Sequence, residues 1–77
     1  MGIGIDIVRL TTGDTIIHNA TATATVKEIK EKIYLLEGTD PDEQHLLFQD
    51  RELIDDEKTI ADYGVTSGCI VFMVLFS

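Results

Sequence analysis

One segment of this chain has the apolar spacing of a helix, and it constrains everything that can be built around it. Apolar side chains recur there at i, i+3, i+7 and i+10, at Val26, Ile29, Ile33 and Leu36. This spacing places them along one stripe of a helix. Thr25 and, three residues later, Glu28 have the form of a capping box, and Gly38 can end a helix in the left-handed conformation. We therefore expect one amphipathic helix between Thr25 and Gly38.

The residues before this helix have the period of strands. Residues 1–10 alternate, with isoleucines at Ile3, Ile5 and Ile7 on one face. A turn-forming cluster at residues 11–14 then predicts a hairpin to a second strand at residues 15–20. Residues 20–25 alternate alanine and threonine. They are expected either to extend the second strand or to form a loosely held loop.

Short apolar runs after the helix predict three more strands. Residues 44–49 form a strand, and Leu53 and Ile54 a brief return strand beyond a polar turn. Residues 59–63 favour a short helical turn that begins at Thr59. The final strand, residues 69–76, is apolar on both faces, as is typical of a strand in the middle of a sheet.

This order of elements predicts an α+β fold, a mixed five-stranded sheet with one amphipathic helix packed on one face. The first and last strands are the most apolar, so we expect them to be central and adjacent. That arrangement is the β-grasp architecture. No linker or repeat interrupts residues 1–77, which we expect to form one domain.

Charge and cysteine content exclude several classes of function. Fourteen Asp and Glu oppose six Lys and Arg, giving a formal net charge of −8, which disfavours nucleic acid and anionic membrane surfaces as partners. The same charge favours basic or apolar protein surfaces. Cys69, His18 and His45 are the only Cys and His residues, too few for a four-ligand Cys/His metal site. We expect no metal and no cofactor, and the lone thiol fits a reducing compartment.

No catalytic constellation is expected. Cys69 has no basic group or helix N-terminus nearby in the sequence pattern, so an inert, buried or half-buried thiol is favoured over a nucleophile. The acidic run at residues 55–57 lacks the spaced ligands of a calcium loop and indicates a solvated loop.

Several motifs, taken in order, resemble ubiquitin and its relatives. They are Glu37-Gly38, residues 41–48, residues 53–55, residues 59–65 and Val74-Leu75. The resemblance is dense from Thr25 onward and looser before it. It also places His18 where the family has a core leucine, so we expect either a partly buried histidine or a strand shifted by one residue.

The resemblance implies a protein-binding face on the sheet. The apolar residues of the family's binding face fall on Leu10, Leu47 and Val74, and Phe72 stands where the family has a flanking histidine. Positions that are basic in the family are here Val8, His45, Arg51 and Phe76. The expected partner-binding residues are Leu10, Leu47, Phe72, Val74, Val8, His45, Gln49, Arg51 and Phe76.

Periodicity by itself leaves the opposite assignment open. In the final strand both sides are apolar, so Leu47, Phe72 and Val74 could form core while their neighbours face out. The resemblance instead assigns Val71, Met73 and Leu75 to the core.

The resemblance implies a non-catalytic interaction module. The chain ends Leu75-Phe76-Ser77 and not in the family's conjugated Gly-Gly, which is similar to non-conjugated domains embedded in larger proteins such as proteasome shuttle factors. The implied partners are proteasome subunits, ubiquitin-binding helices and ubiquitin-associated domains. We expect a monomer in the cytoplasm or nucleus. The alternatives are a modifier truncated before its Gly-Gly and a structural adaptor subunit of a ubiquitin-ligase complex.

Overall fold

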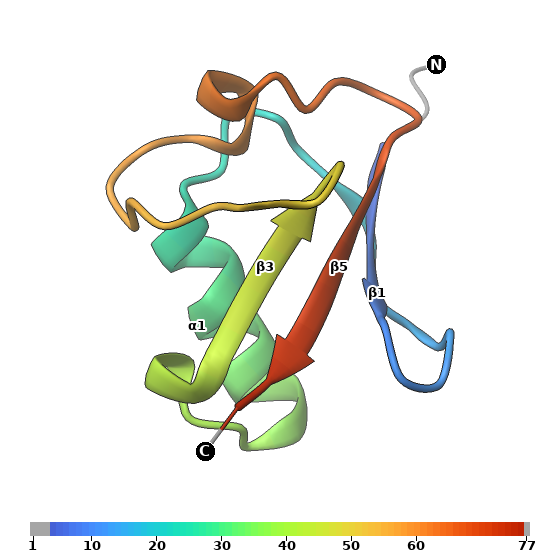
Figure 1. The fold of residues 1–77 in the computed structure, drawn as a ribbon, viewed down its shortest axis with the longest axis vertical. Helices are drawn as coiled ribbons and strands as arrows, with labels where there is room; N and C mark the ends of the chain where they lie inside the picture. The colour runs from blue at the N-terminus through green and yellow to red at the C-terminus, as the bar shows by residue number, and fades with distance from the viewer. Residues whose placement is uncertain (1–3, 77) are drawn as a thin grey trace.

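The computed structural model describes residues 4–76 as five strands, one α-helix and two short 3-10 helices (Figure 1). In chain order these are β1 (Ile5–Arg9), β2 (Thr15–Ala20), α1 (Val26–Glu37), η1 (Pro41–Glu43), β3 (Gln44–Phe48), β4 (Arg51–Glu52), η2 (Ile60–Tyr63) and β5 (Ile70–Leu75). The strands form one sheet in the order β2-β1-β5-β3-β4. β1 and β5 are parallel neighbours, and the other pairs are antiparallel. This confirms the predicted α+β, β-grasp fold, with the first and last strands adjacent.

The capping box forms as the sequence predicts. The Glu28 backbone N–H donates to the Thr25 hydroxyl at 3.1 Å, and the Thr25 backbone N–H donates to the Glu28 carboxylate at 2.9 Å. Gly38 ends the helix with φ +78°, the left-handed conformation that glycine adopts without steric cost. Local sequence therefore sets both ends of α1.

The buried stripe of α1 is one residue shorter than predicted. Val26, Ile29 and Ile33 are buried, but Leu36, predicted on the same stripe, is 57% exposed. Leu36 points in nearly the same direction around the helix as Ile29. It lies in the last turn, directly before the final helical residue Glu37.

α1 lies across one face of the sheet (Figure 1), and one apolar core fills the space between them. Its buried members are Ile5, Ile7, Ile17, Val26, Ile29, Ile33, Leu46, Leu53, Ile60, Val65, Val71 and Met73. Ile3, expected on the same face as Ile5 and Ile7, lies outside the described residues. Buried Gln44 joins the two layers, because its side-chain amide donates to the backbone carbonyls of Lys30 and Thr39, each at 3.1 Å.

The brief return strand is shifted from its predicted position. β4 covers Arg51–Glu52, Leu53 is buried just beyond it, and its backbone N–H donates to the Leu46 carbonyl at 2.8 Å. Ile54, predicted as strand, is 75% exposed and follows the strand. The shift arises from a tight two-residue turn: Gln49 and Asp50 take φ +51° and +65°, so the strand pairs again at once.

Residues 21–24 form a loop, one of the two predicted alternatives, but the loop is not loosely held. The Ile60 and Ala61 N–H groups donate to the carbonyls of Ala24 and Ala22, both at 3.0 Å, and Thr25 bridges to Thr59. The small, half-buried alanines let the backbone of η2 approach this closely.

The last strand divides its residues between two faces. Val71 and Met73 are fully buried, as the resemblance implies. Leu75, expected in the core, is 40% exposed because it pairs with Gln44 at the far end of the sheet, in the last position of the strand.

Within residues 4–76, no helix combines the length and the apolar content that crossing a bilayer requires.

Candidate protein-binding surface

The sheet has a second face, opposite α1. Successive side chains of a strand point to opposite faces. Because Leu46, Val71 and Met73 are buried in the core, their neighbours Leu47, Phe72 and Val74 point away from the helix. None of the three belongs to the core cluster, and each retains solvent exposure. The structure thus selects the arrangement implied by the resemblance over the reverse one.

Strand register brings these side chains into contiguous rows. Val8 is opposite Phe72, Phe72 is opposite Leu47, and Leu47 is opposite Glu52. Val74 is opposite His45, and Asp6 is opposite Ile70. Directly opposed side chains lie within contact range of one another. We call this surface the outer face: Asp6, Val8, Leu10, His45, Leu47, Glu52, Ile70, Phe72, Val74 and Phe76.

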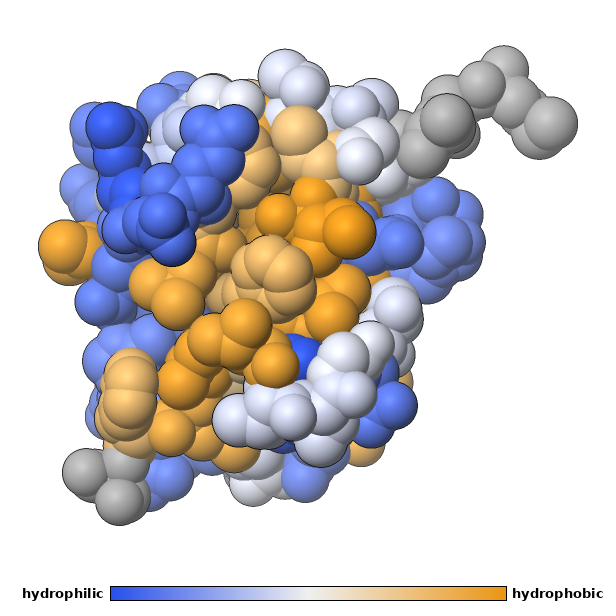
Figure 2. Space-filling view, turned by 45° about the vertical axis from the view of Figure 1, so that its right-hand side comes forward, coloured by the Kyte–Doolittle hydropathy of each residue, from blue (hydrophilic) through white to orange (hydrophobic). Residues whose placement is uncertain are grey.

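Hydrophobic side chains gather on this face. Figure 2 shows hydrophobic colour across the middle of the surface, with hydrophilic colour around its border. Leu10, Ile70 and Phe76 are 50%, 47% and 61% exposed, and Phe72 is 36% exposed. An exposed apolar patch with a polar rim is typical of a site that binds another protein.

Val8 contributes to the outer face differently from the prediction. It is only 8% exposed, so it was wrong to expect an accessible contact residue there. β1 is flanked on both sides, and Val8 pairs with Thr15 of β2 and Phe72 of β5. Val8 thus lies in an inner strand and contributes little accessible area to the outer face.

Leu10 reaches the outer face from the β1–β2 turn. Its backbone N–H donates to the Met73 carbonyl at 3.1 Å, which fixes the turn beside β5. Gly13 takes φ +79°, and its N–H donates to the Arg9 carbonyl at 2.8 Å. The turn is therefore ordered by backbone bonds and holds Leu10 next to the row of Val74.

Two histidine–carboxylate pairs border the apolar rows. His45 Nδ1 lies 2.7 Å from Glu52 Oε2, and the His45 ring meets the Phe76 ring edge-on at a centroid distance of 4.9 Å. His18 Nδ1 lies 2.8 Å from Asp6 Oδ1. Both pairs therefore combine a weakly basic ring with an acid on the surface of the sheet.

His18 is not a partly buried core residue, since 72% of its side chain is exposed. The alternative of a shifted strand is the correct one. Between the pairs Val8↔Thr15 and Ile7↔Ile17 the register of β2 gains one residue. This bulge places Ile17 opposite Ile7 on the core face, so the next side chain, that of His18, points away from the core.

Gln49 and Arg51 lie at the border of the outer face. Gln49 occupies the β3–β4 turn and is exposed. Arg51 is exposed too, but it pairs with Phe48 and so belongs to the row of Phe48 and not to that of Leu47. Both predicted residues are placed to meet a partner only at its edge.

Sequence reasoning did not predict the acidic members of the outer face, Asp6 and Glu52, and the apolar member that it missed is Ile70. It is 47% exposed and stands in the same alternation as Phe72 and Val74. That alternation was the available signal. The resemblance pointed only to the positions of the family's binding face, so Ile70 was passed over.

Cys69 is half-buried beside the start of β5. Its sulfur lies 3.5 Å from the Thr66 hydroxyl. Hydrogen bonding to the Thr66 side chain, and then to its backbone, lowers the pKa of the Cys69 thiol below its ordinary value. The pKa of the thiol is thus lowered by hydrogen bonds to Thr66, and not by a cation or a helix N-terminus.

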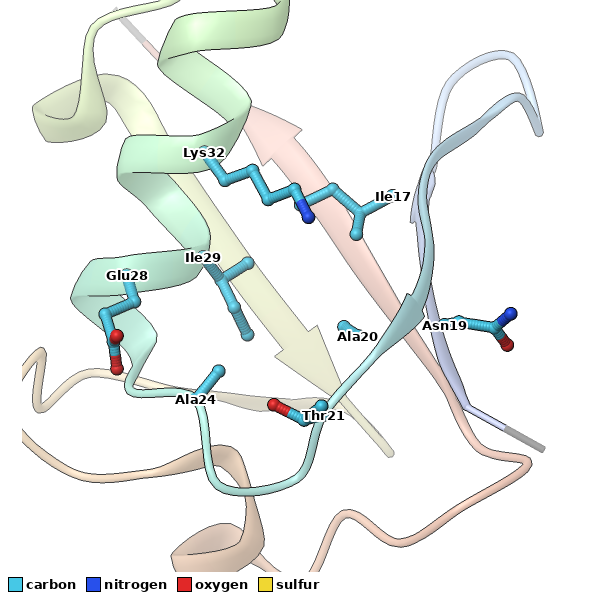
Figure 3. Close-up of a pocket in the computed structure, with 8 residues that line it drawn as sticks. All are labelled: Ile17, Asn19, Ala20, Thr21, Ala24, Glu28, Ile29 and Lys32. Atoms are coloured by element: carbon cyan, nitrogen blue, oxygen red, sulfur yellow. The ribbon is translucent and has the colours of Figure 1, made fainter. Parts of the chain in front are cut away.

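A second surface feature lies on the helix side of the sheet. Figure 3 shows a hollow between α1 and β2, with Lys32 extending from the helix toward Ile17. Its volume is about 300 Å³, and it is lined by Ile17, Asn19, Ala20, Thr21, Ala24, Glu28, Ile29 and Lys32. The small side chains of residues 20–24 leave this space, and neither cysteine nor histidine lines it.

Across residues 4–76, no three His, Cys, Asp or Glu side chains gather closely enough to hold a metal ion.

The model of the ubiquitin family matches residues 7–76. This span contains every residue of the outer face except Asp6.

Proposed function

The chain belongs to the ubiquitin family, and we propose that it is a non-catalytic interaction module that docks partner proteins on its outer face. Members of this family act in protein interaction or protein modification and are typically not catalysts. The observation that carries the proposal is the continuous apolar surface opposite α1, formed by Leu10, Leu47, Ile70, Phe72 and Val74.

The exposed apolar area provides a substantial part of the free energy that a specific complex needs. Burying one fully exposed large side chain contributes roughly 1.5–3 kcal/mol, and a micromolar complex needs about 8 kcal/mol net. Leu10, Ile70, Phe72 and Phe76 are 50%, 47%, 36% and 61% exposed, so each gains roughly half of that value when a partner covers it. Because association itself costs several kcal/mol, close fit and polar contacts at the rim must supply the rest.

The partners that we propose are proteins of the ubiquitin–proteasome system. They are proteasome subunits, ubiquitin-binding helices and ubiquitin-associated domains. An apolar sheet face suits an amphipathic helix laid across it, with side chains at i, i+3 or i+4, and i+7 in contact. The same proposal places the protein in the cytoplasm or nucleus, as a monomer, where a reducing environment would keep the Cys69 thiol free.

Substitution of Leu47 tests the proposal. We expect Leu47→Ala to abolish binding to a ubiquitin-binding helix, because Leu47 stands in the middle row between Phe72 and Glu52. The measurement is amide chemical-shift mapping during titration with a panel of ubiquitin-binding helices and ubiquitin-associated domains. Shift changes should cluster on β1, β3 and β5.

Leu35→Ala is the matched control. Leu35 is 81% exposed on α1, so this variant removes the same atoms from the opposite side of the molecule. It should bind like the parent protein. The proposal is wrong if Leu47→Ala retains the parent affinity while its amide spectrum shows an intact fold.

A further inference from the structure

The basic residues of this protein are concentrated away from the outer face. Lys27, Lys30 and Lys32 lie on α1. Lys58 lies beside the start of that helix, because its carbonyl accepts the Val26 N–H at 2.9 Å. Arg9 is bound to Glu37 of the helix. Among the Lys and Arg side chains of the described residues 4–76, Arg51 at the edge strand is the one that stands near the border of the outer face.

The outer face itself carries acids. Glu52 faces the row of Leu47, and Asp6 is opposite Ile70. With histidines counted as neutral, this face holds two carboxylates and no ammonium or guanidinium group among the described residues 4–76. The wider field has the same sign, since the chain carries a formal net charge of −8.

These charges favour one class of partner. Apolar burial supplies affinity but does not distinguish among amphipathic helices with similar stripes. Charges at the rim distinguish them, because opposite charges speed association and like charges oppose it. A helix with acidic flanks would meet Asp6, Glu52 and the overall negative field, whereas a basic helix would be attracted by all three.

We infer that the outer face selects partner helices that flank their apolar stripe with lysine or arginine, an inference that rests on the proposed docking function. The apolar rows receive the stripe. Glu52 at one border and Asp6 at the other face the basic flanks. Arg51 contributes one opposing charge at the sheet edge, too few to reverse the preference.

Three synthetic helical peptides with one shared apolar stripe test this inference on the full chain. Their flanking positions carry lysine, glutamine or glutamate. Affinities are measured by calorimetry in about 20 mM salt, where surface charges are weakly screened, and in about 300 mM salt, where they are strongly screened. We expect the lysine peptide to bind on the order of tenfold more tightly than the glutamate peptide at low salt. The ratio should shrink at high salt, with the glutamine peptide between the two.

A matched pair of double variants assigns the preference to the outer face. Asp6→Asn with Glu52→Gln should remove most of the selectivity, while Glu31→Gln with Glu57→Gln changes the net charge equally at exposed positions elsewhere and should keep most of it. Retained amide spectra confirm that both variants fold.

The outcomes separate the two proposals. Equal binding of all three peptides, or tighter binding of the glutamate peptide, overturns the charge preference and leaves the docking function standing. Absence of binding by every peptide overturns the docking function and this inference with it. Equal loss of selectivity in both double variants shows that net charge selects the partner and the outer face does not, which also overturns the inference.

Discussion

At the scale of single residues, the capping box of α1 links local sequence to stability. Glu28 accepts the Thr25 backbone N–H and thereby satisfies a donor that no helical carbonyl can reach. The hydrogen bond to the Thr25 backbone, and then that to its side chain, lowers the pKa of Glu28 below its ordinary value. The ionised form is thus the form that the folded protein favours.

This direction fixes how stability should depend on pH. Ionised Glu28 stabilises the folded protein. This contribution to the free energy of unfolding is fully present above the pKa that Glu28 has in the unfolded chain, and it is lost as the pH falls through the lower pKa of the folded protein. We expect Glu28→Ala to lower the free energy of unfolding near pH 7, and the difference from the parent to narrow as the pH falls below 4.5. Urea unfolding at several pH values measures it. Glu31→Ala, an exposed change in the next turn, should show no comparable narrowing, and a pH-independent deficit for Glu28→Ala would contradict this account.

At the scale of elements, the turn of the β3–β4 hairpin contains a residue in a strained backbone conformation. Gln49 and Asp50 both take positive φ, the conformation of a two-residue turn whose twist matches that of the strands. L-residues other than Asn, Asp and Gly take this conformation at a cost of roughly 1–2 kcal/mol. Gln49 is therefore the strained position of the pair.

Replacing the turn with Asn-Gly should stabilise the protein. We expect Gln49→Asn with Asp50→Gly to raise the free energy of unfolding by about 0.5–1 kcal/mol, because both residues adopt positive φ more readily. Thermal and urea unfolding measure the gain. Gln49→Ala keeps the strain and should not stabilise, so an equal gain from the alanine would show that relief at positive φ is not the cause.

At the scale of the whole molecule, the two faces of the sheet separate the core from the proposed docking surface. Leu46 is fully buried against α1, and Leu47, the next residue, belongs to the outer face. Adjacent leucines in one strand thus point to the core and to the proposed docking surface. The core beneath one face is small, so each buried side chain contributes a large part of the net stability.

These two leucines should respond to truncation in opposite ways. Leu46→Ala leaves a cavity in the core and should cost about 2–5 kcal/mol of unfolding free energy. Leu47→Ala should cost much less, because its side chain already meets solvent, yet it should remove partner binding. Urea unfolding combined with peptide titration distinguishes them. Comparable destabilisation by both variants would contradict the separation of core and outer face.

The sequence by itself determined the main elements, although it misplaced the short strand β4. Helical spacing with Thr25 and Gly38 at its ends set the limits of α1, and the alternation of Ile5 and Ile7 set the core face of β1. These features depend on hydrogen bonds and periodicities within a few residues, so local sequence contains them. The family motifs added the order in which the elements assemble.

The tertiary structure decided which faces are covered. β5 is apolar on both sides, so its periodicity does not show which side is buried. The position of α1 shows that Met73 is buried and that Ile70, Phe72 and Val74 are outside the core. The burial of Val8 likewise depends on neighbours from β2 and β5, and the outward turn of His18 on a bulge in the pairing of β2. Alternation defines two faces of a strand, but the element that covers one of them comes from elsewhere in the chain, and no local pattern specifies it.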